Sequence, residues 1–232
     1  MNTVFCAKKK LPSLFKIHTI LFLVGAIYAG NYIIAKEVMP QYVEPSGLVL
    51  IRVWIAALVF IVLQRIFVKE RIKSKRDLFL IFRASMFGVV INQLFFFEGL
   101  SRTSPINASL IMTATPILVL IISAIILKER ITSRKAIGVF LGCSGAILLI
   151  GYSGFTLSGA TFKGDLLVFI NASSYAVYLV IVKPLMKKYH PLTIVSYAFL
   201  FAAPIVAVFG YQAVEEALWL DFGINIYLSI AY

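Results

Sequence analysis

Long apolar runs separated by short polar segments dominate the chain. Seven runs have the length of helices, and none shows the strict alternation of apolar and polar residues that marks a strand. They cover residues 17–38, 45–63, 78–97, 106–127, 136–152, 164–182 and 192–212. An eighth begins near Phe222 and reaches Tyr232. The pattern predicts an all-α, polytopic transmembrane helical bundle rather than an outer-membrane barrel, whose strands have alternating faces.

Composition supports a membrane protein. Apolar residues make up 61% of the chain and charged residues 14%, whereas soluble domains carry about 45–50% and about 25%. Polarity is too low for a disordered chain, and two cysteines, Cys6 and Cys143, are too few for a disulfide scaffold. The net charge is +12, and the basic residues lie between the apolar runs rather than on one face of the molecule. The lipid bilayer is therefore an expected partner and nucleic acid is not.

Lysine and arginine residues predict an orientation. With the N-terminal segment, residues 1–16, in the cytoplasm, 17 of the 22 basic residues fall in cytoplasmic segments. Three, Lys36, Arg102 and Lys163, fall in outer loops. The positive-inside rule thus predicts a multi-pass protein of the cell (plasma or inner) membrane with a cytoplasmic N-terminus. The first run is too long for the apolar region of a signal peptide, so we expect it to be a retained helix.

The chain resembles itself at an offset of 146 residues. Eight identities fall within residues 20–63, among them Tyr32 with Tyr178 and Pro45 with Pro191. Each repeat then holds five helices, and because five is odd the second repeat is inverted. The first repeat covers residues 17–152, and the second, residues 164–232, is incomplete. We expect the native gene product to continue for roughly 60 residues, about two and a half helices, and the 232-residue form alone not to transport.

Polar side chains within the spans are the candidate binding residues, because each is costly in lipid and usually faces the bundle interior. The candidates are Tyr28, Asn31, Arg52, Asn92, Gln93, Tyr175 and Tyr178. Amide and aromatic groups suit a small organic solute with apolar and hydrogen-bonding parts, and Arg52 suits an anionic group. Structural interpretations stay open: an interhelical hydrogen bond for Asn31, a snorkelling or paired cation for Arg52, and interface anchors for the tyrosines.

No catalytic or metal motif accompanies these residues. His18 and His190 lack ligand partners at metal-site spacing, and no Walker loop is present. We therefore expect no enzyme, no metal and no cofactor. Two packing predictions remain. Gly138, Gly142 and Gly145 predict a close helix contact, and Pro116 and Pro204 predict helix kinks.

One stretch, running from the third helix into the fifth, carries a family pattern. It consists of Glu-Gly-Leu-Ser-Arg-Thr-Ser-Pro at residues 98–105, Ala-Ser-Leu-Ile at 108–111, Pro116, Leu127 and Glu129, followed by the glycines of the fifth helix. In this stretch the sequence resembles the EamA-like branch of the drug/metabolite transporter superfamily. Further matches are Gly30, Asn31, Lys36, Arg52, Gly164, Asp165, Ser174 and Tyr175. Tyr28-Ala29 departs from the Trp-Gly of many members, and Tyr175 stands where Trp is frequent.

The resemblance implies ten helices in two inverted halves that move small organic solutes without ATP, often as exporters of amino acids, metabolites or drugs. The predicted function is therefore secondary transport of a small-molecule substrate by alternating access. The alternative is a membrane-embedded enzyme or a lipid-handling protein. Substrate identity, coupling to protons or other ions, and oligomeric state stay open.

Overall fold

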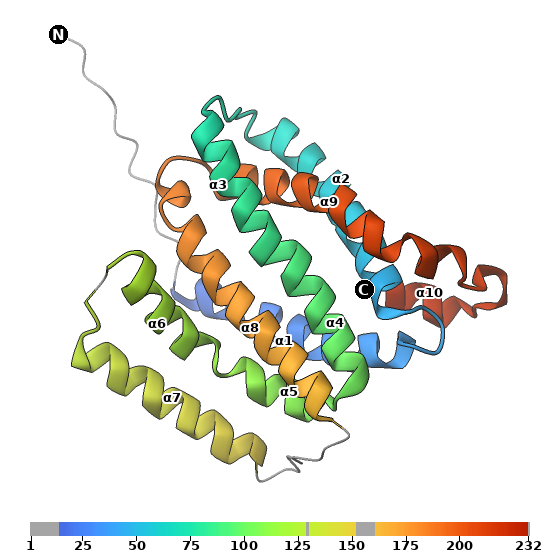
Figure 1. Ribbon diagram of the computed structural model, residues 1–232, viewed down its shortest axis with the longest axis horizontal. Helices are drawn as coiled ribbons and strands as arrows, with labels where there is room; N and C mark the ends of the chain where they lie inside the picture. The colour runs from blue at the N-terminus through green and yellow to red at the C-terminus, as the bar shows by residue number, and fades with distance from the viewer. Residues whose placement is uncertain (1–13, 129, 152–160, 232) are drawn as a thin grey trace.

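The computed structural model describes residues 14–128, 130–151 and 161–231, in which every regular element is helical. This confirms the all-α, polytopic helical bundle (Figure 1). The ranges 14–128 and 130–151 contain α1 (Leu14–Val38), α2 (Pro45–Phe67), α3 (Lys75–Ser85), the π-helix η1 (Met86–Ile91), α4 (Asn92–Arg102), α5 (Pro105–Met112), α6 (Thr115–Ile126) and α7 (Ser133–Gly151). The range 161–231 contains α8 (Phe162–Val182), η2 (Leu185–Lys187), α9 (Pro191–Glu215), η3 (Trp219–Asp221) and α10 (Ile224–Ala231).

Within those described ranges, six helices are long and apolar enough to cross a membrane. They are Phe15–Val38, Pro45–Phe67, Lys75–Arg102, Pro105–Ile126, Phe162–Lys187 and Pro191–Glu215. Each matches one of the seven predicted runs. The remaining run, residues 136–152, forms α7, which is not among the six. The eighth run forms the short helix α10. Cys6, Glu129 and Tyr232 lie outside the described residues.

Helices α2 and α9 make the most extensive contact in the structure and run side by side (Figure 1). Glycines set their separation. A Cβ on Gly210 would overlap the carbonyl oxygen of Ser46, and one on Gly47 would lie 3.1 Å from the Cβ of Ala213. Small residues allow such close approach of backbones in a membrane. The 146-residue offset predicts that α2 and α9 are equivalent, and the assignment of two repeats, residues 17–152 and 164–232, likewise stays a prediction.

Helix α4 packs on α8 through a second pair of glycines. A Cβ on Gly164 would lie 2.8 Å from the carbonyl oxygen of Gly99, and one on Gly99 would lie 2.9 Å from that of Gly164. Beside this contact, Thr103 Oγ1 donates to Asp165 Oδ1 at 2.5 Å. The end of α4 and the start of α8 are therefore held together by backbone proximity and a buried hydrogen bond.

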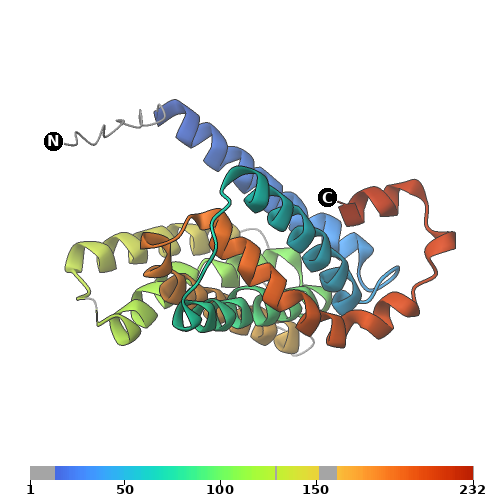
Figure 2. The ribbon, with the colours of Figure 1, turned by 90° about the horizontal axis from the view of Figure 1, so that it is seen from above.

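Lys36 joins α1 to the same end of α4. Its ammonium donates to the carbonyl oxygens of Leu100, Ser101 and Thr103 at 2.8, 2.7 and 2.7 Å. The last carbonyls of a helix lack intrahelical partners and carry partial negative charge, so a lysine satisfies both needs. This attachment matters because α1 otherwise leads away from the bundle (Figure 2), and none of its most apolar stretch is buried.

The third span, Lys75–Arg102, is helical throughout and contains the π-helix η1 near its middle. Two residues of α8 hold this wide turn in place. Ser174 of α8 donates its hydroxyl to the carbonyl oxygen of Phe87 at 2.5 Å. Gly88 leaves room for the ring of Tyr178, which any Cβ there would overlap. The π-helix ends at Ile91, directly before Asn92, and so it sets the direction in which Asn92 and the following side chains point.

The two prolines predicted to lie within spans occupy different positions in their helices. The fourth span is broken between α5 and α6, and Pro116 lies at the start of α6, as a helix-breaking proline requires. Pro204 lies inside α9, as the sequence indicates, and the kink there stays a prediction.

The close contact predicted at Gly138, Gly142 and Gly145 is wrong for the described residues, because a Cβ on any of them would meet no heavy atom within 4 Å. Helix α7 packs on another face, where the buried Cys143 donates its thiol to the Thr113 carbonyl oxygen at 3.1 Å.

Candidate functional site

One face of α1 supplies the first wall of a cavity. Tyr28, Asn31 and Tyr32 lie three and four residues apart, which places them on the same side of the helix. The side-chain oxygen Oδ1 of Asn31 is fully buried and accepts no hydrogen bond from the protein. A buried amide oxygen without a donor is energetically unfavourable, and a bound solute that donates a hydrogen bond would relieve it.

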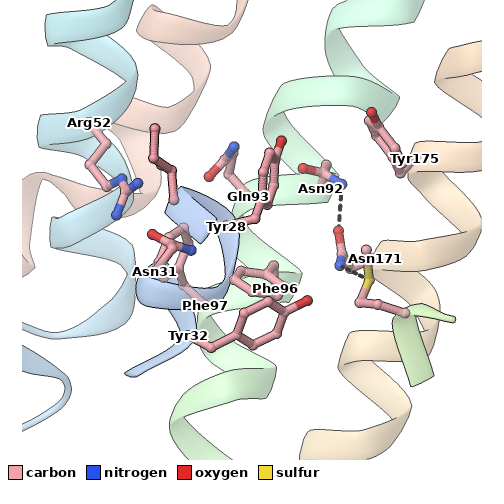
Figure 3. Close-up of a pocket in the computed structure, with 12 residues that line it drawn as sticks. Tyr28, Asn31, Tyr32, Arg52, Asn92, Gln93, Phe96, Phe97, Asn171 and Tyr175 are labelled. Carbon is pink, nitrogen blue, oxygen red and sulfur yellow. Dashed lines mark hydrogen bonds between the residues drawn. The ribbon is translucent and has the colours of Figure 1, made fainter. Parts of the chain in front are cut away.

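The opposite wall comes from α4, directly after the π-helix. Asn92, Gln93, Phe96 and Phe97 follow a spacing of one turn and share a face. The amide of Asn92 donates to Asn171 Oδ1 of α8 at 2.5 Å. Asn171 in turn donates to the Met112 sulfur of α5 at 3.2 Å (Figure 3). These two hydrogen bonds thus join α4, α8 and α5 along this wall.

Arg52 supplies the positive charge of the site from α2. Its guanidinium carbon lies 5.2 Å from the centre of the Phe97 ring, within the range of a cation–π interaction. Figure 3 shows Arg52 facing Asn31 across the edge of the cavity. An arginine in this position is stabilised by an aromatic face and places a positive charge beside the cavity.

These walls enclose a cavity of about 340 Å³, within the range of small-molecule sites. Six of the seven candidate residues line it: Tyr28, Asn31, Arg52, Asn92, Gln93 and Tyr175. The seventh, Tyr178, does not. Its ring stacks on Tyr175 with centroids 5.9 Å apart and planes at 24°. Tyr178 therefore supports the wall, while substrate binding by the other six stays a prediction.

Several lining residues were not among the candidates. They are Ile27, Tyr32, Phe96, Phe97, Met112 and Asn171. Helix spacing would have indicated all of these except Met112, because each of the others lies one turn from a candidate residue: Ile27 before Asn31, Tyr32 after Tyr28, Phe96 after Asn92, Phe97 after Gln93 and Asn171 before Tyr175. Met112 carries no such signal, since the break between α5 and α6 determines where it points.

The chemistry of the lining is hydrogen bonding, aromatic contact and one positive charge. No group of three or more His, Cys, Asp or Glu side chains that could hold a metal ion occurs in residues 14–128, 130–151 and 161–231. Such a lining suits an organic molecule held by shape, amide contacts and charge.

Comparison with known proteins identifies the family. The sequence profile of the EamA-like transporter family matches residues 16–151, more than half of the chain. The chain belongs to the EamA-like transporter family. This EamA-like protein is 34% identical over 158 residues to an uncharacterized transporter of Archaeoglobus fulgidus, a match that covers 68% of this chain and 54% of that relative. The chain therefore spans about half the length of that relative.

Other EamA-like relatives extend the match. The uncharacterized transporter YyaM of Bacillus subtilis is 26% identical over 217 residues, covering 92% of this chain and 71% of YyaM. The WAT1-related protein At3g53210 of Arabidopsis thaliana is 24% identical, with 89% and 63% covered. One solved crystal structure shares the fold with a TM-score of 0.64 at 18% identity, covering 88% of this chain and 72% of its own. The protein is thus a multi-pass membrane protein of a transporter family.

Proposed function

We propose that this protein is a secondary transporter that exports a small organic solute, such as an amino acid, another metabolite or a drug. The observation that carries the proposal is the cavity between α1, α2, α4 and α8, into which polar and aromatic side chains of four spanning helices converge. Solute sites of transporters commonly lie between helices of two repeats near the midplane of the membrane.

The lining narrows the class of solute. Asn31 Oδ1 calls for a hydrogen-bond donor, Arg52 favours an anionic group, and the amides of Asn92 and Gln93 add further polar contacts. The aromatic rings of Tyr28 and Phe96 favour an apolar body. We therefore propose a solute that carries polar groups at one end and an apolar or aromatic part at the other.

Alternating access is the proposed mechanism, with the two inverted halves rocking about the cavity. The absence of a Walker motif from the sequence supports transport without ATP. The positions of the basic residues support a plasma (inner) membrane location with a cytoplasmic N-terminus. Export follows the family resemblance.

The test is uptake of radiolabelled solutes into proteoliposomes that contain the full-length gene product, after a thermal-shift screen for solutes that bind. Asn31→Ala removes the buried acceptor and is expected to raise KM about 5- to 10-fold, the effect of one hydrogen bond. The control is Ser173→Ala on α8, because Ser173 donates to the Phe169 carbonyl of its own helix and does not line the cavity. Unchanged kinetics in Asn31→Ala would contradict this site. Turnover of a solute without its movement would favour the alternative, a membrane-embedded enzyme.

A further inference from the structure

A second cavity, of about 550 Å³, lies where α2 ends and α9 begins. Figure 1 shows the end of α2, the start of α3 and the start of α9 at the same end of the molecule. Three basic side chains line this cavity: Arg65, Lys69 and Arg71. We propose that it binds the phosphate headgroup of an anionic phospholipid, such as phosphatidylglycerol. The proposal is independent of the solute cavity and of transport.

The fold brings the three basic residues together through Gln64. The carbonyl oxygen of Gln64 accepts hydrogen bonds from the N–H groups of Val68 and Lys69 at 3.0 and 2.8 Å. Its buried side chain donates to the carbonyl oxygen of Glu70 at 2.5 Å. Lys69 adopts a left-handed conformation with φ of 53°, which ends the helix and turns the chain back. Lys69 and Arg71 therefore come to line the same cavity as Arg65.

One carboxylate also lines the cavity, and its position is compatible with an anionic ligand. Glu70 Oε2 accepts a hydrogen bond from the His190 N–H at 2.9 Å, at the start of α9. The positive end of a helix dipole stabilises a carboxylate there. The lining thus keeps a formal charge of +2 from Arg65, Lys69 and Arg71 against Glu70. Ser196 and Tyr197 add hydroxyl groups on the side of α9.

The cavity has a basic end and an apolar end, as a phospholipid has a charged headgroup and apolar acyl chains. Its basic residues stand at and beyond the end of the α2 span, Pro45–Phe67, where the headgroups of a bilayer lie. The apolar residues Ile61 and Leu200 line the side that lies further along the two spans. Leu200 is 47% exposed and Ile66 58% exposed, so the helix faces beside the cavity are open to acyl chains. Basic pockets between spanning helices on the cytoplasmic side are typical sites for anionic headgroups.

The basic lining of the cavity is not simply a result of the many basic residues at this end of the molecule. Lys73 in the connecting segment and Lys75 at the start of α3 are exposed, yet they do not line the cavity. This difference supplies a matched control, because two double variants remove the same charge from the same end of the molecule. Arg65→Gln with Arg71→Gln removes two cavity residues, and Lys73→Gln with Lys75→Gln removes two others.

The experiment is native mass spectrometry of the purified protein titrated with phosphatidylglycerol or phosphatidylcholine. We expect one phosphatidylglycerol to be retained by the unmodified protein and by the Lys73/Lys75 variant. The Arg65/Arg71 variant is expected to bind it about 10- to 30-fold more weakly, since two basic contacts are lost. Phosphatidylcholine is expected to be displaced readily from all three proteins. Size-exclusion profiles check that each variant is folded.

Three results would overturn the proposal. Equal loss of phosphatidylglycerol in both variants would show non-specific attraction by the basic segment. Equal retention in all three proteins would place the lipid elsewhere. Competition with inorganic phosphate tests whether the site binds a soluble anion instead of a lipid. If inorganic phosphate bound as tightly as phosphatidylglycerol and displaced it, the cavity would be a site for a soluble anion. Weak competition by inorganic phosphate supports the lipid.

Discussion

Asn31 and Lys36 lie five residues apart on α1, and their polar groups have opposite roles. The Lys36 ammonium donates three hydrogen bonds to the end of α4, and this attachment holds the helix in place. The Asn31 oxygen is buried without a donor from the protein. A satisfied group contributes to stability, whereas an unsatisfied one beside a cavity contributes to binding when a ligand supplies the missing partner.

The structural role of Lys36 can be tested by Lys36→Met, which keeps the length of the side chain and removes the donors. Three carbonyl oxygens then lose their partner, so we expect the free energy of unfolding in detergent to fall by about 2–4 kcal/mol. Thermal denaturation measures the effect. Lys163→Met, at an exposed position near the start of α8, is the control and should change stability by less than about 0.5 kcal/mol. Equal loss in both variants would contradict the argument.

At the residue scale, helix periodicity was sufficient to find side chains that share a face. Tyr28 and Asn31 on α1, and Asn92 and Gln93 on α4, line the cavity as that pattern predicts. Periodicity does not show whether a side chain lines the cavity or packs behind its wall. Tyr178 follows Tyr175 by three residues, yet its ring packs over Gly88 and only supports the wall. That distinction depends on a neighbouring helix, which a single pattern cannot include.

At the scale of helices, the meaning of a glycine depends on what stands opposite. Gly164 faces the backbone of α4, so a Cβ would lie 2.8 Å from the Gly99 carbonyl oxygen. Gly142 belongs to the motif that predicts a close contact, but a Cβ there would meet nothing within 4 Å. A GxxxG pattern indicates that close packing is possible, and only the structure tells which glycines use it.

Paired alanine substitutions test this contrast. Gly164→Ala forces a methyl group against the backbone and should lower the free energy of unfolding by about 1–3 kcal/mol. Gly142→Ala fills open space in a helix and should raise it by up to about 1 kcal/mol, because alanine favours the helix. Both are read from thermal unfolding in the same detergent. If the two substitutions shifted stability in the same direction, the close approach of α4 and α8 would be in doubt.

Helix positions were more predictable than their irregularities. The apolar runs predict the spans within a few residues, because twenty apolar residues in sequence have few alternatives in a bilayer. The break before α6 also follows from Pro116. The π-helix at Met86–Ile91 has no such signal, because contacts from α8 and α9 hold it in place.

For the whole molecule, the clearest quantity in the sequence is the side on which basic residues lie. Within the described part of the chain, Arg65, Lys69, Arg71 and Lys187 lie near span ends that the orientation assigns to the cytoplasm. The ion pair of Lys188 with Asp77, at 3.2 Å, joins two segments on that same predicted side. The orientation itself stays a prediction, as does the inverted second repeat.

Cysteine labelling tests the orientation. In a chain with Cys6→Ser and Cys143→Ser, single cysteines are placed at Ser74, Ser133 or Ser158. A membrane-impermeant maleimide added to intact cells is expected to label Ser158→Cys, which lies outside the described residues. It should leave Ser74→Cys and Ser133→Cys unlabelled until the cells are opened. The reverse pattern would place the N-terminus outside the cell.

The π-helix has a consequence for the whole arrangement that concerns phase. Ser85 and Asn92 are seven residues apart, so on an uninterrupted α-helix they would point almost the same way. Instead Ser85 donates to the Ala198 carbonyl of α9, and Asn92 donates to Asn171 of α8. One surplus residue in the wide turn rotates the second half of the span relative to the first. The span can therefore contact α9 with its first half and α8 with its second half. Deletion of one residue from Met86–Ile91 would remove this rotation, so that only one of the two halves could keep its contacts.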